Sequence, residues 1–160
     1  MYINKALIVF CLCLGLTQQS VCAQIVDTHG MLFQFNNDST ASVVRVLNVK
    51  RCGIPPCVEW NGIGYVVNCI GTNAFYCRYS VQNVYIPETV IRISPNAFFQ
   101  CTSLQHIYME CSEPPVCDDN AFADIDFRRC VLHVPSGSLQ RYKNSEAWSR
   151  FRKIKEYKKK

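Results

Sequence analysis

The feature that most constrains this 160-residue chain is a tripeptide that recurs three times in its middle. Asn-Ala-Phe begins at Asn73, at Asn96 and at Asn120, so the copies recur at a nearly constant interval. A short run of β-forming residues follows each copy: Val84–Ile86, Ile107–Met109 and Leu132–Val134. Such self-similarity is typical of solenoids, in which one repeat cannot bury its own apolar face and stacks on its neighbours. The sequence therefore predicts about three stacked repeats over residues 66–135.

The residue types within each repeat predict which side chains face inward. A small alanine beside a large phenylalanine indicates a short helical turn that directs the ring into the core. Phe75, Phe98 and Phe122 should therefore share one continuous interior. In the β run that follows, alternate side chains face opposite ways. The predicted inward pairs are Val84 with Ile86, Ile107 with Met109, and Leu132 with Val134.

The residue between the members of each inward pair should point to solvent, and these residues are Tyr85, Tyr108 and His133. Neighbouring strands lie about 4.8 Å apart, so the three rings should form a ladder on one face. Together with the neighbouring His106, they are the candidate binding residues. A plainer interpretation stays open, because cross-strand aromatic pairs stabilise a sheet by roughly 0.2–1 kcal/mol each without any ligand.

Residues 24–65 predict an N-terminal β region that closes one end of the stack. Met31–Phe35 and Ala41–Leu47 are two strands around the turn residues 36–39. A second hairpin is expected around Asn61-Gly62, because this pair accommodates positive φ at both central turn positions. The segment between Cys52 and Cys57 contains two prolines and is expected to be a loop. Solenoids need such terminal caps, since an end repeat would otherwise expose its core.

Residues 136–160 predict a C-terminal helical cap with a basic tail. Ser136 can begin a short helix that carries Leu139 and Tyr142. A second helix is expected from Asn144 or Ser145 onward, with an apolar stripe at helical spacing: Ala147, Trp148, Phe151 and Ile154. Residues 141–160 hold nine Lys or Arg residues against two Glu residues. The basic end is either a solvated tail or an attachment to an acidic partner or membrane surface.

Residues 1–23 have the pattern of a signal peptide. Lys5 precedes the apolar run Ala6–Leu16, and Val21-Cys22-Ala23 resembles a cleavage site, so the mature chain would begin at Gln24. The run is shorter than the roughly 20 residues that span a bilayer, and no segment of the mature chain is expected to be transmembrane. A lipid anchor on Cys22 is the weaker alternative. An exported protein, at the cell surface, in the periplasm or secreted, is therefore predicted.

Eight of the 11 cysteines lie beyond the predicted signal peptide: Cys52, Cys57, Cys69, Cys77, Cys101, Cys111, Cys117 and Cys130. An even number in an exported chain favours disulfides. Two pairs look locally closable, Cys52 with Cys57 and Cys111 with Cys117, and the cysteines inside the repeats would behave as small core residues. A metal site is disfavoured, because no Cys-x-x-Cys pair exists and the three histidines are scattered.

Several stretches resemble the BspA-like leucine-rich repeat proteins, which carry the Treponema-type repeat and are bacterial exported or surface proteins. The strongest resemblance lies in Ile70–Phe75, in Val84–Phe98 and in the ending that starts at Leu132. It implies an α/β leucine-rich-repeat solenoid, β-rich with short helical turns, with an N-terminal β-hairpin cap and a C-terminal helical cap. Some members are described as adhesins for host matrix proteins, and the family has no established catalytic residues.

The favoured function is a non-enzymatic recognition module that binds a protein or glycan through the predicted ring ladder. The alternative is a structural, envelope-associated domain attached through its basic C-terminal tail. An enzyme is disfavoured, since the sequence lacks a Gly-x-Ser-x-Gly elbow, a phosphate-cradling loop and a His-Glu-x-x-His motif. We expect no cofactor, no nucleic-acid partner and a monomeric protein.

Overall fold

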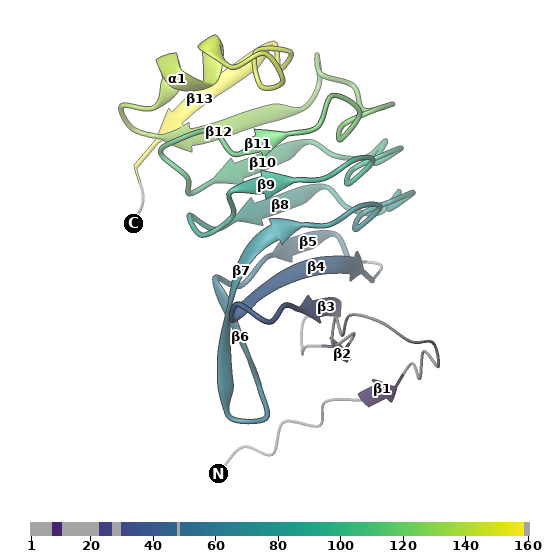
Figure 1. Ribbon diagram of the computed structural model, residues 1–160. Coiled ribbons are helices and arrows are strands. Elements are labelled where there is room, and N and C mark those ends of the chain that lie inside the picture. The colour runs from purple at the N-terminus through teal and green to yellow at the C-terminus, as the bar shows by residue number, and fades with distance from the viewer. Residues whose placement is uncertain (1–7, 11–22, 27–29, 48, 159–160) are drawn as a thin grey trace.

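The computed structural model describes residues 8–10, 23–26, 30–47 and 49–158. This described part of the chain winds into a β-solenoid of about five turns with almost no helix. The coils between the N-terminal strands and the last coil each contribute one strand to each of two sheets, and the last coil contributes a strand to the second sheet alone. Figure 1 shows the strands of successive coils piled in order toward the C-terminus. The solenoid predicted from the repeats is thereby confirmed, and it is more strongly β than the α/β class that we expected.

The first sheet has eight strands among the residues that the structure describes. Along the sheet the strands are β1 (Ile8–Phe10), β2 (Ala23–Val26), β3 (Met31–Phe35), β4 (Thr40–Val46), β7 (Ile63–Ile70), β9 (Arg92–Ile93) and β11 (Val116–Cys117), with β6 (Cys57–Trp60) paired to β7. The pairs from β1 to β4 are antiparallel, and those from β4 through β7 and β9 to β11 are parallel. The sheet thus changes at β4 from an antiparallel meander to the parallel strands of the solenoid.

The second sheet is entirely parallel and carries the candidate site. Its strands follow the order β13 (Lys153–Tyr157), β12 (Val131–Pro135), β10 (His106–Met109), β8 (Asn83–Ile86) and β5 (Arg51–Gly53). Buried residues alternate with more accessible ones along β8, β10 and β12, as the two-residue period of a strand requires. The predicted inward pairs of these three strands all lie in the core.

Both predicted N-terminal hairpins form. β3 and β4 pair antiparallel around the turn residues 36–39, where Ser39 has φ of 60°. β6 and β7 pair around Asn61 and Gly62, whose φ angles are 50° and 76°. Positive φ at both central residues matches the twist of the flanking strands, which is why Asn-Gly is favoured there. The expected loop at Cys52–Cys57 is only partly a loop, because Arg51–Gly53 forms the edge strand β5.

The short helical turns expected in the repeats are hydrogen-bonded turns instead of helix. Ala74 donates to the carbonyl of Gly71, and Tyr76 donates to that of Asn73, so each bond closes a tight turn. Asn73 and Asn96 have φ of 60° and 55°, and asparagine tolerates this left-handed conformation better than most residues. A left-handed residue inside the turn prevents the chain from continuing as an α-helix. The repeat therefore turns a corner without building a helical layer.

The three repeat phenylalanines form one continuous stack. The ring centroids of Phe75 and Phe98 lie 4.5 Å apart, and those of Phe98 and Phe122 lie 4.9 Å apart. All three side chains are buried. This arrangement confirms the predicted shared interior. It also explains why the repeats need one another, since each ring buries its faces against the rings of the adjacent coils.

The C-terminal segment differs from the predicted two-helix cap. The single α-helix in the described part of the chain is α1 (Leu139–Asn144), which begins after Ser138 instead of Ser136. The expected second helix is not formed: residues 146–150 are turns, and Ile154 lies in β13, which pairs parallel with β12. Ala147-Trp148 follows Ala121-Phe122 at nearly the interval of the repeats and continues the ring stack. The apolar spacing that suggested a helix therefore reflects one more turn and strand of the solenoid.

Most of the predicted signal peptide lies outside the described residues, apart from β1 and the start of β2. The described residues include no helix with the length and apolar character needed to cross a membrane.

Candidate recognition face

The predicted ladder of rings is present on the outer face of the second sheet. The centroids of Tyr85 and Tyr108 lie 4.6 Å apart with 7° between the ring planes. Those of Tyr108 and His133 lie 4.3 Å apart with 11° between the planes. The strand register explains this, because the three residues are direct partners across β8, β10 and β12. The rings cover one another's faces; Tyr85 is exposed, whereas Tyr108 and His133 are half-buried.

His106 joins the ladder through its neighbour on β12. Its Nδ1 lies 3.1 Å from Nε2 of His133, so one nitrogen donates a proton to the other. The two imidazole centroids are 5.3 Å apart. Burial, then the charges of His106 and Lys155, lowers the pKa of His133. The ladder therefore holds an uncharged His133 at neutral pH.

The ladder has two different ends, which sequence reasoning did not identify. On β13 the partner of His133 is Lys155, and on β5 the partner of Tyr85 is Gly53. One end is therefore cationic and the other has no side chain. Neither could be inferred without recognising β5 and β13 as strands. The apolar Cys52 between charged Arg51 and Gly53 was the available sequence signal, but so short a strand cannot establish a period.

A second column of outward residues runs beside the ladder. In register it consists of Arg51, Asn83, His106, Val131 and Lys153. Arg51, Lys153 and Lys155 are exposed. None of the described residues in these two columns is acidic. The face therefore combines stacked rings with cations at both edges of the sheet.

Tyr157 secures the last coil against this face. Its hydroxyl donates to the carbonyl of Met109 at 3.0 Å, reaching past β12 to β10. Its ring stands edge-on to Tyr108, with centroids 6.1 Å apart. The side chain thus links β13 to the strand that carries the middle rung of the ladder.

The eight cysteines beyond the predicted signal peptide are free thiols in the structure, so neither of the two expected disulfides is formed. Cys52 is buried on β5, with its Sγ 4.0 Å from the sulfur of Met31, whereas Cys57 is exposed. The thiol of Cys111 donates to the carbonyl of Pro87 at 3.2 Å. The two pairs stay predictions for the exported protein, to be checked by mass measurement with and without reductant.

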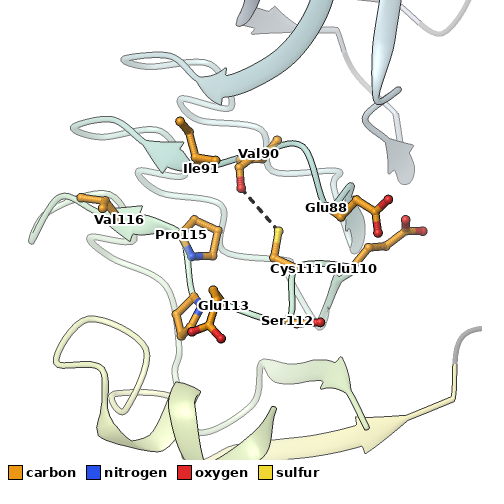
Figure 2. Close-up of a pocket in the computed structure, with 10 residues that line it drawn as sticks. Glu88, Val90, Ile91, Glu110, Cys111, Ser112, Glu113, Pro115 and Val116 are labelled. Atoms are coloured by element: carbon orange, nitrogen blue, oxygen red, sulfur yellow. Dashed lines mark hydrogen bonds between the residues drawn. The ribbon is translucent and has the colours of Figure 1, made fainter. Parts of the chain in front are cut away.

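A cleft separate from the ladder lies between the loop after β8 and the loop after β10 (Figure 2). Its volume is about 420 Å³. Glu88 and Glu110 extend in the same direction from adjacent coils, while Ile91 and Val116 are exposed on the far side. Arg141 already pairs with Glu113 of the rim at 3.1 Å. The cleft is therefore partly neutralised by the chain itself.

The described residues contain no group of three or more His, Cys, Asp or Glu side chains placed to hold a metal ion. The buried thiols are poorly suited to nucleophilic chemistry. Burial raises the pKa of Cys101 to about 12, and its Sγ donates to the carbonyl of Phe75 at 3.0 Å. A thiolate is the reactive species, so this environment suppresses reactivity.

Two sheets whose strands run parallel from coil to coil, with one stacked ring at each turn, define a repeat solenoid. The repeat interval falls within the roughly 20–29 residues that are typical of leucine-rich repeats. The model for the BspA type leucine-rich repeat region matches residues 64–157 in six copies. The chain belongs to this family. The match extends past Pro135, in agreement with the additional coil that Trp148 and β13 form.

Solved structures with the same fold come from bacteria. A leucine-rich cell surface protein of Faecalibacterium prausnitzii is 21% identical with a TM-score of 0.53, over 84% of this chain and 42% of that one, so the chain spans less than half of it. A leucine-rich repeat protein of Bacteroides capillosus is 23% identical with a TM-score of 0.57, over 82% of this chain and 97% of that one. One of Bacteroides ovatus is 19% identical with a TM-score of 0.52, over 79% of this chain and 39% of that one. No curated protein matches the chain.

Proposed function

We propose that this protein is a non-enzymatic recognition module, exported to the cell surface or secreted, that binds a protein or glycan partner through the ring ladder. The observation that carries the proposal is the continuous stack of Tyr85, Tyr108 and His133 on the outer face of the second sheet. Rings held on adjacent strands of a solenoid form a rigid surface. A rigid surface loses little conformational freedom when it binds a partner.

The polarity of the ladder supports recognition over simple stabilisation of the sheet. The phenylalanine stack already buries its rings in the core, so the fold does not need a second stack for burial. Tyr85 is 40% exposed. Tyrosine and histidine edges offer hydroxyl and imidazole groups as donors and acceptors. Such amphipathic rings are enriched where proteins bind partners.

The family supports an exported location. The Faecalibacterium protein of the same fold is called a cell surface protein, and residues 1–23 of this chain have the pattern of a signal peptide. Fractionating cells that produce the protein, followed by mass measurement of its N-terminus, tests this. A mature chain that begins at Gln24 outside the cytoplasm supports the proposal, and an unprocessed cytoplasmic chain contradicts it.

The ladder is tested with the double variant Tyr85→Ala/Tyr108→Ala in a binding screen against extracellular matrix proteins and glycans. We expect saturable binding by the wild type and its loss in the variant. Tyr79→Ala is the matched control, because Tyr79 is 55% exposed, bonds to Gln100 at 3.3 Å and lies outside the ladder. If the double variant has a lower melting temperature but unchanged binding, the ladder serves only the sheet.

A second candidate is a structural, envelope-associated domain attached through the basic C-terminal end, which includes Arg150, Arg152 and Lys158. Lys159 and Lys160 lie outside the described residues. Attachment of this kind would weaken as salt increases and would not distinguish between polyanions. Deleting residues 158–160 separates the two candidates, because the recognition proposal expects ligand binding to persist without the tail.

A further inference from the structure

The ladder ends in a gap the size of one rung. Gly53 is the direct partner of Tyr85 on β5, and β5 is the last strand of the second sheet on that side. The centroids of Tyr85 and Tyr108 are 4.6 Å apart and those of Tyr108 and His133 are 4.3 Å apart, close to the spacing between strands. A planar group lying above Gly53 would therefore meet the face of Tyr85 that points away from Tyr108 at about the same separation as the existing rungs.

The backbone does not require glycine at this position. Gly53 is not among the residues with positive φ, and no described atom outside its immediate neighbours lies within 4 Å of a Cβ built on it. The side chains before it alternate normally, with Arg51 exposed and Cys52 buried. Glycine weakens a strand interior, and one use of it there is to let a ligand approach closely. The gap is thus a feature of the surface, with no strain to explain it.

The charges around the gap indicate the chemistry of an occupant. Arg51 lies beside Gly53, and Lys153 and Lys155 lie on β13 at the other edge of the sheet. Four strand spacings separate these edges, a distance of about 19 Å. The two described columns contain no carboxylate, and Glu110, two residues beyond Tyr108, belongs to the separate cleft. An extended ligand that carries negative charge along its length would meet a cation at each end and rings in between.

The polar groups around the rings favour a saccharide over an acidic protein segment. Outward Asn83 lies on β8 next to the gap, His106 lies one strand further on β10, and the tyrosines add hydroxyl groups. The one aliphatic side chain in the two described columns is Val131, which is half-buried. A sugar ring presents C–H groups to an aromatic face, whose quadrupole is negative, and hydroxyls to polar neighbours.

From these observations we infer that the face binds an anionic glycan and that the gap above Gly53 is its first subsite, where one sugar ring stacks on Tyr85. This inference rests on the proposed recognition function of the ladder and specifies its ligand class. Arg51 pairs with a carboxylate or sulfate of the bound sugar. Lys155 and Lys153 receive the other end of the chain.

The test uses the full mature chain and Gly53→Val, which fills the gap with a residue that strands favour. The probe is a tetramer of galacturonic acid, measured by calorimetry at low salt, with its methyl ester as the uncharged counterpart. We expect the tetramer to bind, the ester to bind at least tenfold more weakly, and Gly53→Val to weaken the tetramer at least tenfold. Gly64→Val is the matched control, because Gly64 is also an exposed strand glycine with no described atom within 4 Å of an added Cβ.

The outcomes separate this inference from the proposed function. If the tetramer binds Gly53→Val as tightly as the wild type while Tyr85→Ala/Tyr108→Ala loses it, the subsite is overturned and the ladder proposal stands. If the ester binds as tightly as the acid, or a poly-glutamate peptide replaces the tetramer at equal concentration, the anionic-glycan class is overturned. If the tetramer fails to bind the wild type, and Tyr85→Ala/Tyr108→Ala loses binding to a different partner found in the screen, the anionic-glycan inference is overturned and the recognition function of the ladder stands.

Discussion

The ring of Trp148 stands edge-on against the ring of Phe122, with centroids 5.5 Å apart and 64° between their planes. Its indole N–H donates to the carbonyl of Pro115 at 2.9 Å. The stack of three repeat phenylalanines therefore ends on a tryptophan that is fully buried. The last coil turns its ring across the stack, so the outer face of Phe122 is covered by an edge.

Replacing Trp148 with alanine should destabilise the protein severely. The change removes a large buried side chain and leaves the carbonyl of Pro115 without its donor, so we expect a loss of about 3–5 kcal/mol in the free energy of unfolding. Urea denaturation followed by circular dichroism measures it. Trp148→Phe should lose less, because a ring still covers Phe122.

Tyr76→Ala provides the control for that measurement. Tyr76 also stacks on a ring of the next coil, Phe99, at 5.0 Å, but it is 44% exposed. We expect a change of no more than about 1 kcal/mol, since a half-exposed aromatic pair contributes little beyond that. Equal losses for Trp148→Ala and Tyr76→Ala would contradict the idea that the C-terminal coil completes the core.

The core was predictable from sequence because the repeats preserve their pattern. Asn-Ala-Phe fixes the ring position in each coil, and the period of two in β8, β10 and β12 fixes which residues point outward. The same alternation correctly placed Tyr85, Tyr108 and His133 in one ladder. Because each coil stacks on the next, the pattern within one repeat also determines which residues of neighbouring repeats contact one another. The positions of the side chains in the middle of the chain could therefore be predicted.

The ends were harder because their patterns are ambiguous. The spacing of Trp148, Phe151 and Ile154 fits a helix and equally fits a turn followed by a strand. The choice depends on β12, which would otherwise be the edge strand of the sheet with unpaired backbone N–H and C=O groups. A parallel strand pairs with these groups, and a helix would not. Gly53 and Lys155 were missed for a related reason, since both lie on edge strands that only the neighbouring coil defines.

The left-handed corner of the repeat gives a prediction with an internal comparison. Asn96 has φ of 55°, where a β-carbon is costly. Asn96→Ala should destabilise the protein by about 1 kcal/mol, because alanine lacks the local polar contacts that let asparagine tolerate this conformation. Asn96→Gly should be neutral or stabilising at the same site. Thermal unfolding of the two variants decides it, and an alanine variant as stable as the glycine one would refute the strain.

Thiol reactivity should divide the cysteines by burial. Burial raises the pKa values of Cys101 and Cys130 to about 12, so almost no thiolate is present at pH 8. Cys57 is exposed. In the reduced, folded protein we expect a maleimide reagent at pH 8 to label Cys57 within minutes and to leave Cys101 and Cys130 unlabelled, as peptide mass mapping would show.

Denaturant supplies the control for this labelling. In urea all thiols of the chain should react at similar rates, because unfolding exposes them and removes the desolvation that raises the pKa values of Cys101 and Cys130. If Cys57 stays unlabelled in the native protein but reacts after reduction, it is oxidised in the exported form, in accordance with the predicted Cys52–Cys57 disulfide. Rapid native labelling of Cys101 would contradict the buried turn that the structure shows.

The ladder should make stability depend on pH near neutrality. Burial and the charges of His106 and Lys155 lower the pKa of His133 in the folded protein, while its pKa in the unfolded chain is about 6.5. The unfolded chain therefore binds this proton more readily, and folding stability decreases as the pH falls below about 6.5 through the lower folded pKa. We expect the melting temperature to fall between pH 7.5 and pH 5. His133→Gln should reduce this fall, because glutamine does not titrate.

The comparison isolates His133 from the carboxylates. Asp38 also has a lowered pKa, owing first to its hydrogen bond with the side chain of Thr40, but it is present in both proteins and titrates at lower pH. Lys155→Gln supplies the second arm: it removes one of the charges that lower the pKa of His133, so that pKa should rise, which NMR titration of the imidazole protons would measure. An unchanged pKa of His133 in Lys155→Gln would mean that burial and His106 account for the whole shift. Equal pH dependence of the melting temperature in the wild type and His133→Gln would mean that groups outside the ladder cause the loss of stability in acid.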